Sequence, residues 1–432
     1  MVAAERFAIS RLINRIGFGP KPGEFAELLS LGFDRAAAQI LSRPSNYRPN
    51  LADELSLSDL GLRPRPNTPE ILKYAEAKRF QLRSASLWWL DEMVSTDSAF
   101  AERMTWFWHG HWATSYQKVD EPIVMFNQID KLRKHATGNF KELSREMVLD
   151  GALIFWLDGQ RNTARAPNEN LSRELMELFI LGVNRYTEAD VKETAKALTG
   201  YNVKKSSGVV SRNLRQSFNG QISFLGTRGT FDALSLVDYL VSLEDCQRFI
   251  PERIWYRFIS TSSTLTDENS ISDAFYNRDI SRAMQALVAH EGFQDPLNTQ
   301  VKSPLEWLVA TLRAFQILPS KFERPDYLLN LLQNLGQRPF FPPSVGGWPA
   351  DEAWISAASA QVRIQAAQYL AKHANLDELS SKKQSERIDF IADWLGIPEW
   401  SDRTRMALQG AIRDVQRLAL LAICSPEFTV NA

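Results

Sequence analysis

The sequence predicts a mainly α-helical protein: a multi-helix orthogonal bundle in one large or two fused helical lobes, with a small β-hairpin insertion near residues 204–230. Three observations predict this fold. Helix-start and helix-stop signals follow one another along most of the chain. Hydrophobic residues recur at helical spacing in the long segments between those signals. Only two stretches break the pattern, and one of them contains a turn-prone Asn-Gly pair between hydrophobic residues.

Composition and charge narrow the class of protein. The chain has 432 residues, of which 44% are hydrophobic and 23% charged, as is usual for globular proteins. Its 50 Lys and Arg residues nearly cancel its 51 Asp and Glu residues, so no global attraction to nucleic acid or an acidic membrane exists. No stretch approaches the roughly 20 apolar residues that a membrane span needs. We therefore expect no nucleic-acid partner and no membrane span.

The cysteines and the first residues bear on the cellular compartment. Cys246 and Cys424 are the only cysteines, and their wide separation disfavours a disulfide framework or a thiolate zinc site. The opening residues run directly into a helical pattern without a signal peptide. We expect a cytoplasmic protein; had a leader been trimmed earlier, the protein would be periplasmic.

Helix signals define the elements in order. Thr68-Pro69 is an N-cap followed by proline at the first helical position, and it opens a long predicted helix with hydrophobic residues at helical spacing from Ile71 to Met93. Gly138 and the capping sequence after it, then Thr187, mark further helix boundaries. Residues 42–68 read as a proline-rich surface excursion.

The second break, at 204–230, contains Asn219-Gly220 as the predicted hairpin turn. It also divides the chain. We predict an N-terminal helical lobe over 1–203, the insertion itself, and a C-terminal helical lobe over 231–432.

The most informative predicted helix covers residues 167–182. It is hydrophobic nearly all round, which is typical of a buried helix, yet Glu174 and Glu177 share one stripe, with Glu169 and Arg173 beside it. Carboxylates in such a helix are costly unless they are paired or bind a metal. One interpretation is ion pairs of Arg173 with Glu169 and Glu177. The other is a site with Glu174, Glu177 and Arg173 as catalytic residues and the three glutamates among the metal ligands.

Two histidines could complete such a site. His109 and His111 lie in an aromatic segment, and a His-x-His spacing binds metals when both rings share one face. In a regular helix the two rings diverge by about 200°, so shared ligation would need the helix to break at Gly110. The alternative is that both rings pack among the neighbouring aromatic side chains. Phosphate-loop, dinucleotide, nucleophile-elbow and zinc-protease motifs are absent, so no nucleotide cofactor is expected.

Several blocks along the chain form a recognisable set. They are Leu12–Pro20, Phe107–His111, His135–Phe140, Pro167–Gly182, Tyr186–Val191, Ala197–Tyr201, Val301–Glu306, Pro342–Pro349 and Cys424–Phe428. Together they resemble a bacterial family catalogued as domain of unknown function 1800, over essentially the whole chain. Family members often carry a His-Asp pair where this chain has Ser217-Phe218, which puts any site that uses the pair in doubt here. The resemblance implies a helical fold and no assigned reaction.

Two functions follow as hypotheses. The first is a metal-dependent enzyme, oxidative or hydrolytic, in which Glu174, Glu177 and a histidine hold a divalent ion such as iron, manganese or zinc. The second is a non-catalytic helical scaffold. Relatives are often encoded beside a family that resembles alkaline phosphatases, so the resemblance implies such a protein partner, docked on 42–68, 204–230 or Pro342–Trp354. A third choice is an aromatic-lined ligand pocket near Trp106.

Overall fold

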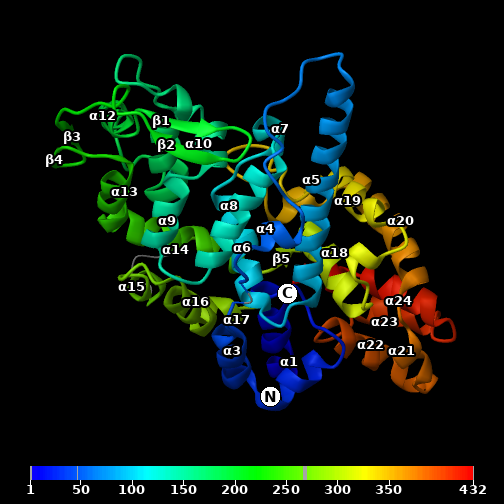
Figure 1. Cartoon of the computed structure of the whole chain (residues 1–432). Coiled ribbons are helices and arrows are strands. Elements are labelled where there is room, and N and C mark those ends of the chain that lie inside the picture. The colour runs from blue at the N-terminus through cyan, green and yellow to red at the C-terminus, as the bar shows by residue number, and fades with distance from the viewer. Residues whose placement is uncertain (1, 46, 266–269, 432) are drawn as a thin grey trace.

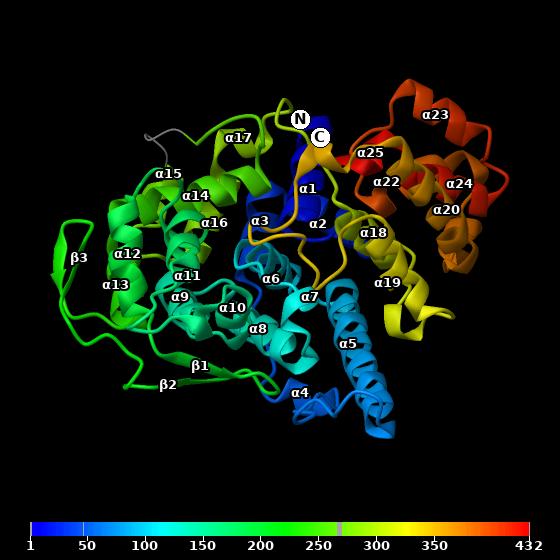
Figure 2. The same ribbon diagram turned by 90° about the horizontal axis from the view of Figure 1, so that it is seen from above.

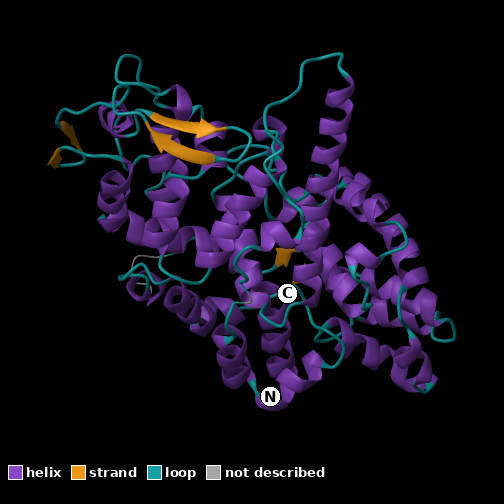
Figure 3. Cartoon of the chain, in the orientation of Figure 1, coloured by secondary structure: helices purple, strands orange, loops and turns teal. Residues whose placement is uncertain are grey.

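A computed structural model describes residues 2–45, 47–265 and 270–431, and helices dominate it (Figures 1 and 3). The mainly α-helical prediction is confirmed. The helices of the first half are α1 (Val2–Arg11), α2 (Glu24–Leu31), α3 (Phe33–Ser42), α4 (Leu51–Glu54), α5 (Pro69–Ser95), α6 (Ala99–His111), α7 (Tyr116–Val119), α8 (Pro122–His135), α9 (Phe140–Val148), α10 (Gly151–Trp156), α11 (Asn170–Glu174) and α12 (Glu188–Ala197).

The second half continues in the same manner. Its helices are α13 (Ala233–Ser242), α14 (Glu244–Phe258), α15 (Ser270–Ala274), α16 (Ile280–Ala289), α17 (Glu291–Gln294), α18 (Pro304–Ala314), α19 (Pro325–Asn334), α20 (Ala357–His373), α21 (Asp377–Ser381), α22 (Arg387–Leu395), α23 (Asp402–Gln409), α24 (Val415–Ile423) and α25 (Pro426–Thr429). Among all these described segments, none is both long enough and apolar enough to cross a bilayer.

Local capping chemistry explains several helix boundaries. Helix α5 begins at Pro69 after Thr68, as predicted. The Asn139 side chain accepts a hydrogen bond from the Lys141 amide at the start of α9, and Thr187 forms a capping box with Asp190 at the start of α12. Each cap satisfies amide groups that the first helical turn leaves without partners.

Small antiparallel hairpins interrupt the helices, as predicted. Strand β1 (Tyr201–Lys204) pairs with β2 (Val209–Arg212), and β3 (Ile222–Phe224) pairs with β4 (Thr227–Gly229). The predicted turn at Asn219-Gly220 is wrong, because those residues lie between the two hairpins. The tight turn of β3–β4 is Leu225-Gly226, where φ is +43° and +78°. Two successive positive φ values match the right-handed twist of the strands.

Two fully or almost fully buried helices form the centre of the fold. Every residue of α18 is buried, and so is every residue of α6 except Ala99 and Gly110. Figures 1 and 2 both place α6, α18 and α5 between a group containing α9, α13 and α14 on one side and a group containing α20 to α24 on the other. One continuous hydrophobic core includes side chains from all of these groups.

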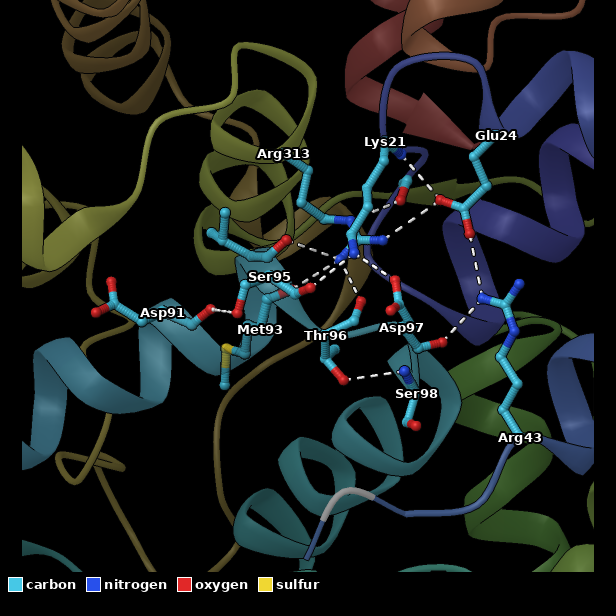
Figure 4. Close-up of polar contacts among 12 residues, drawn as sticks. Lys21, Glu24, Arg43, Asp91, Met93, Ser95, Thr96, Asp97, Ser98 and Arg313 are labelled. Carbon is cyan, nitrogen blue, oxygen red and sulfur yellow. Dashed lines mark hydrogen bonds and ion pairs between the residues drawn. The ribbon is translucent and has the colours of Figure 1, made fainter. Parts of the chain in front are cut away.

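A buried arginine joins three distant segments near this centre (Figure 4). Arg313, on α18, donates to the carbonyl of Gly19 at 2.9 Å. It also donates to the carbonyls of Met93, Val94 and Thr96 at the end of α5, at 3.0–3.3 Å, and pairs with Glu24 at 3.5 Å. These are carbonyls that the last turn of a helix leaves unpaired, so Arg313 caps α5 and fixes the Gly19 loop against it.

Two further arginines hold the N-terminal helix against the C-terminal half. Arg11 donates to the carbonyl oxygens of Phe293 and Asn298, at 2.7 and 3.0 Å. Arg15, in a π-helical segment (Leu12–Ile16), donates to the carbonyls of Ile259, Asn298 and Asn431. The short strands β5 (Gln300–Val301) and β6 (Val430–Asn431) pair beside them. Residues far apart in the sequence therefore share one polar layer.

Candidate functional site

The predicted carboxylate helix is α11 followed by a π-helical segment, Leu175–Ile180. The amides of Leu181 and Gly182 both donate to the carbonyl of Met176, at 2.9 and 3.0 Å. Its hydrophobic side chains are buried except for the half-buried Leu178, as expected for a helix that is apolar nearly all round. π-Helical segments are rare and often lie at functional sites.

The charged side chains of this helix are only half-buried, and most have partners. Arg173 lies 3.4 Å from Glu169 and 2.5 Å from Glu188, and its hydrogen bond to Glu188 raises the pKa of Arg173. The expected Arg173–Glu169 pair is thus present. Glu177 instead accepts a hydrogen bond from the Tyr186 hydroxyl. Arg173 therefore pairs with carboxylates other than Glu177, within the part of the chain described.

Glu174 has a different environment from Glu177. Burial raises the pKa of Glu174, and the nearby Glu177 carboxylate raises it further, whereas Arg173 opposes the change. The two glutamates therefore interact, as their shared stripe predicted. Glu174 takes up a proton more readily than an isolated glutamate does.

His109 and His111 do not share a face, because α6 runs through Gly110 to His111 without a break. His109 accepts a hydrogen bond at Nε2 from the Phe340 amide, at 3.2 Å. His111 bonds through Nε2 to the Phe179 carbonyl, at 2.9 Å. Burial among aromatic rings lowers the pKa of both histidines to about 3, so both are neutral at pH 7. Aromatic packing was the alternative interpretation of this segment.

The histidines and the carboxylate helix are neighbours through the main chain. The contact is between the His111 ring and the Phe179 carbonyl, and not between an imidazole and Glu174 or Glu177. Among the described residues, no group of three or more His, Cys, Asp or Glu side chains is placed to hold a metal ion. Metal binding by His109, His111, Glu169, Glu174 and Glu177 stays a prediction.

A small cavity opens beside His111, and one of its walls is Trp106, near which the third hypothesis placed an aromatic-lined pocket. Its volume is about 50 Å³, and a single water needs roughly 10–15 Å³ of such space, so it has room for only a few heavy atoms. Helix α6, helix α14 and the loop after α19 supply its walls. The lining residues are Trp106, Phe107, Gly110, His111, Arg253, Tyr256, Arg257, Gln337, Gly346, Trp348, Pro349 and Ala350.

Two glycines bring the walls of this cavity together. Gly347 has φ of +80°, and a Cβ atom on it would overlap the carbonyl oxygen of Gly110. Only glycine permits both this backbone conformation and so close an approach. Trp348 then stacks on Trp106, with ring centroids 4.7 Å apart. The sequence marked Gly110 and the loop after Pro342 separately, but it held no signal that they touch.

The charges around the cavity are unbalanced. Arg257 pairs with Glu306, which also accepts from Arg103. Burial raises the pKa of Glu306, but the two arginines outweigh this effect and lower it to about 2. Arg253 forms no hydrogen bond or ion pair with any residue in the described ranges, and its Nε is buried without a partner. Burial lowers the pKa of Arg253, partly opposed by Tyr256. Among the described residues that line the cavity, none is Asp or Glu.

Other polar groups of the wall have free hydrogen-bonding capacity. A carbonyl can only accept, so the Nε2 of neutral His111 carries the proton that binds Phe179, and Nδ1 is left as an acceptor. His111 Nδ1 and Trp348 Nε1 are both buried without a hydrogen-bond partner in the described structure. The cavity thus combines guanidinium and indole donors with one acceptor. Such a set suits an oxyanion that still carries one proton.

Comparison with known proteins yields one match. The sequence pattern of the family described as "Protein of unknown function (DUF1800)" matches residues 11–430. No curated protein and no solved structure matches the chain.

Proposed function

Because the chain belongs to the DUF1800 family, whose description assigns no activity, we propose its function from the geometry: it binds a compact oxyanion beside Arg253 and Arg257. By oxyanion we mean a phosphate, sulfate or carboxylate group, either free or as part of a larger molecule. The observation that supports this most strongly is that Arg253 has no carboxylate partner among the residues that the structure describes.

Electrostatics support the proposal. Partly buried arginines normally pair with carboxylates, since an unpaired charge away from water is costly. Arg257 follows that rule through Glu306, whereas Arg253 does not. An anion in the cavity would supply the missing charge, and a guanidinium binds phosphate or carboxylate through two parallel hydrogen bonds. The volume of about 50 Å³ suits a group of that size.

Calorimetric titration with inorganic phosphate and with sulfate at low ionic strength tests the proposal directly. Arg253→Gln should weaken binding by about tenfold or more, as expected for the loss of a charged hydrogen-bonding partner. Arg248→Gln is the matched control, because Arg248 lies on the same helix but is exposed and pairs with Glu244 at 2.6 Å. Equal affinities of the two variants, or no binding by the wild type, would refute the proposal.

A second proposal keeps the predicted metal-dependent enzyme. A divalent ion near Glu174 and Glu177 would relieve the repulsion that contributes to the raised pKa of Glu174. Metal analysis of the purified protein, beside a Glu174→Ala/Glu177→Ala variant, tests it. Equal metal content in the two proteins would rule out these glutamates as the ligands.

Docking to a phosphatase-like partner also stays a prediction. Of the three surfaces suggested for it, the loop Pro342–Trp354 contributes Gly346 and Trp348 to the cavity wall. A partner that bound this loop would change access to the oxyanion site. Co-purification with a stoichiometric partner, lost in a variant of this loop, is the corresponding measurement.

A further inference from the structure

We propose a second binding site, in a groove between α8 and the β1–β2 hairpin, for an uncharged, hydroxyl-rich small molecule the size of a mono- or disaccharide. The groove has a volume of about 580 Å³. Sites for small molecules usually enclose roughly 300–1,000 Å³. Figure 1 shows the hairpin lying beside α8 and α10.

Three elements form the walls of the groove. One face of α8 supplies Val124, Asn127, Asp130 and Lys131, at helical spacing. The junction of α9 and α10 supplies residues 149–151, and the hairpin supplies the opposite wall. The full set is Val124, Asn127, Asp130, Lys131, Leu149, Asp150, Gly151, Tyr201, Ser207, Gly208, Val209, Val210, Ser211 and Arg212.

Direct backbone contact holds the hairpin in place. A Cβ atom on Gly151 would overlap the main chain of Gly208, so the tip of the hairpin rests on the start of α10. Gly208 itself has φ of +72° and packs against Val124. Asn127 adds a hydrogen bond to the carbonyl of Ser207, at 3.4 Å. The groove is therefore a fixed feature of the packing and does not depend on a flexible side chain.

Each charged group of the groove has a polar partner, either within the groove or just outside it. Lys131 pairs with Asp150 at 3.0 Å, and Arg212 lies 3.6 Å from Asp232. Asp130 accepts from the Tyr47 hydroxyl through one oxygen, at 3.2 Å. The formal charges of the four lining ionisable residues cancel, so the groove attracts neither a strong anion nor a strong cation.

Unused hydrogen-bonding groups remain on the walls. The Oδ1 atom of Asp130 and the hydroxyl of Ser207 are buried without partners in the described structure. The first can only accept, and the second can donate. Val124, Leu149 and Tyr201 add apolar surface to the same walls. A polyol presents hydroxyl donors, oxygen acceptors and apolar C–H faces, and it therefore matches this wall better than a wholly apolar or an ionic ligand does.

Saturation-transfer NMR and calorimetry with glucose, N-acetylglucosamine, maltose and cellobiose test the proposal. We expect at least one of these probes to bind. Ser211→Trp, which places a bulky ring in the groove from an exposed strand position, should weaken that binding by about tenfold or more. The control is Ser223→Trp, at an exposed position of the separate β3–β4 hairpin, which should leave affinity unchanged. Asp130→Asn should weaken binding severalfold through the loss of a charged acceptor.

Several outcomes would overturn the inference. These are failure of all four sugars to bind, sugar binding that survives both Ser211→Trp and Asp130→Asn, and preferential binding of spermidine, which would identify a cation site. The two sites are separable, since Arg253→Gln should weaken phosphate binding by about tenfold or more and leave sugar affinity unchanged. Ser211→Trp should have the reverse effect.

Discussion

Two arginines, Arg313 and Arg253, show how the same side chain can serve different ends in one fold. Arg313 is buried in α18, where four carbonyls and Glu24 surround its guanidinium. Arg253 lies in α14 beside a cavity and has no hydrogen-bond or ion-pair partner in the described ranges. The described residues supply hydrogen-bond and ion-pair partners for the guanidinium of Arg313, but only the ring of Tyr256 for that of Arg253.

This difference gives a criterion for deciding which buried arginines of this protein stabilise the fold and which bind a ligand. Arg313 is satisfied by helix-end and loop carbonyls, and Arg103 by Glu306. Arg11 and Arg15 also donate to such carbonyls through their terminal nitrogens, although the Nε atom of each is buried without a partner in the described structure. Each of these arginines joins segments that are distant in sequence, so its role is to hold the fold together. Arg253 connects no such segments in the described structure, and the described walls of its cavity carry no carboxylate. A role in ligand binding therefore explains its position better than a role in the fold.

The largest effect is expected when the satisfied arginine is removed. Arg313→Met leaves the carbonyls at the end of α5 and the Glu24 carboxylate without this partner. We therefore expect a loss of about 3 kcal/mol or more in the free energy of unfolding. Urea denaturation followed by far-ultraviolet circular dichroism measures it. A loss below about 1 kcal/mol would contradict the structural role.

Gly347→Ala should have the next largest effect, at the cavity itself. The added methyl meets the Gly110 carbonyl and forces a left-handed backbone on alanine, so we expect a loss of about 2–3 kcal/mol and weaker phosphate binding. Gly226→Ala is the control, because Gly226 also has a positive φ but has open space around it. It should cost only about 1 kcal/mol, and equal losses would show that the close approach is unimportant.

Mildly acidic pH should lower the free energy of unfolding, because His109 and His111 are held neutral in the folded protein. The folded protein holds His109 and His111 neutral, with pKa values of about 3, while the unfolded chain takes up protons near pH 6.5. The contribution of the two neutral histidines to the free energy of unfolding is therefore complete above pH 6.5. It decreases as the pH drops toward 3, by about 2 kcal/mol for each histidine at pH 5. Denaturation at pH 7 and pH 5 should show a smaller difference in His109→Leu than in the wild type.

Removing the unsatisfied arginine should have the smallest effect on stability. Arg253→Met takes away a charge that no residue in the described chain balances, so the free energy of unfolding should stay within about 1 kcal/mol of the wild type, or rise. The same denaturation experiment compares it with Arg313→Met. A loss as large as that of Arg313→Met would mean that Arg253 also has a structural role.

The fold was largely predictable because its determinants are local. Proline at the first position of α5, the Asn139 and Thr187 caps, and the helical spacing of hydrophobic residues all act within a few residues. The hairpin region was found for the same reason. Its turn was misplaced, because Asn-Gly is the commonest tight turn whereas Leu225-Gly226 adopts positive φ values here in its tertiary setting.

The candidate site was less predictable, because it depends on contacts between distant segments. Local spacing could show that Glu174 and Glu177 interact, and that two histidines in a helix diverge. It could not show that His111 would bond to the Phe179 carbonyl, or that Gly347 would lie on Gly110. Arg253 gave no signal, since only its surroundings in three dimensions reveal that a partner is missing.

The contact between Arg15 and the carbonyl of Asn431 has a consequence for biosynthesis. The two residues are 416 positions apart, and a ribosome adds roughly 5–20 residues per second. About 20 to 80 seconds therefore pass between the synthesis of Arg15 and that of its acceptor. Throughout that interval the nascent N-terminal segment exposes the hydrophobic side chains that the folded protein buries, such as Ile9 and Leu12, and Arg11 and Arg15 lack their final acceptors. We expect a chaperone to bind such a segment until the C-terminal residues are made. Early termination of translation would leave Arg15 without the Asn431 acceptor permanently.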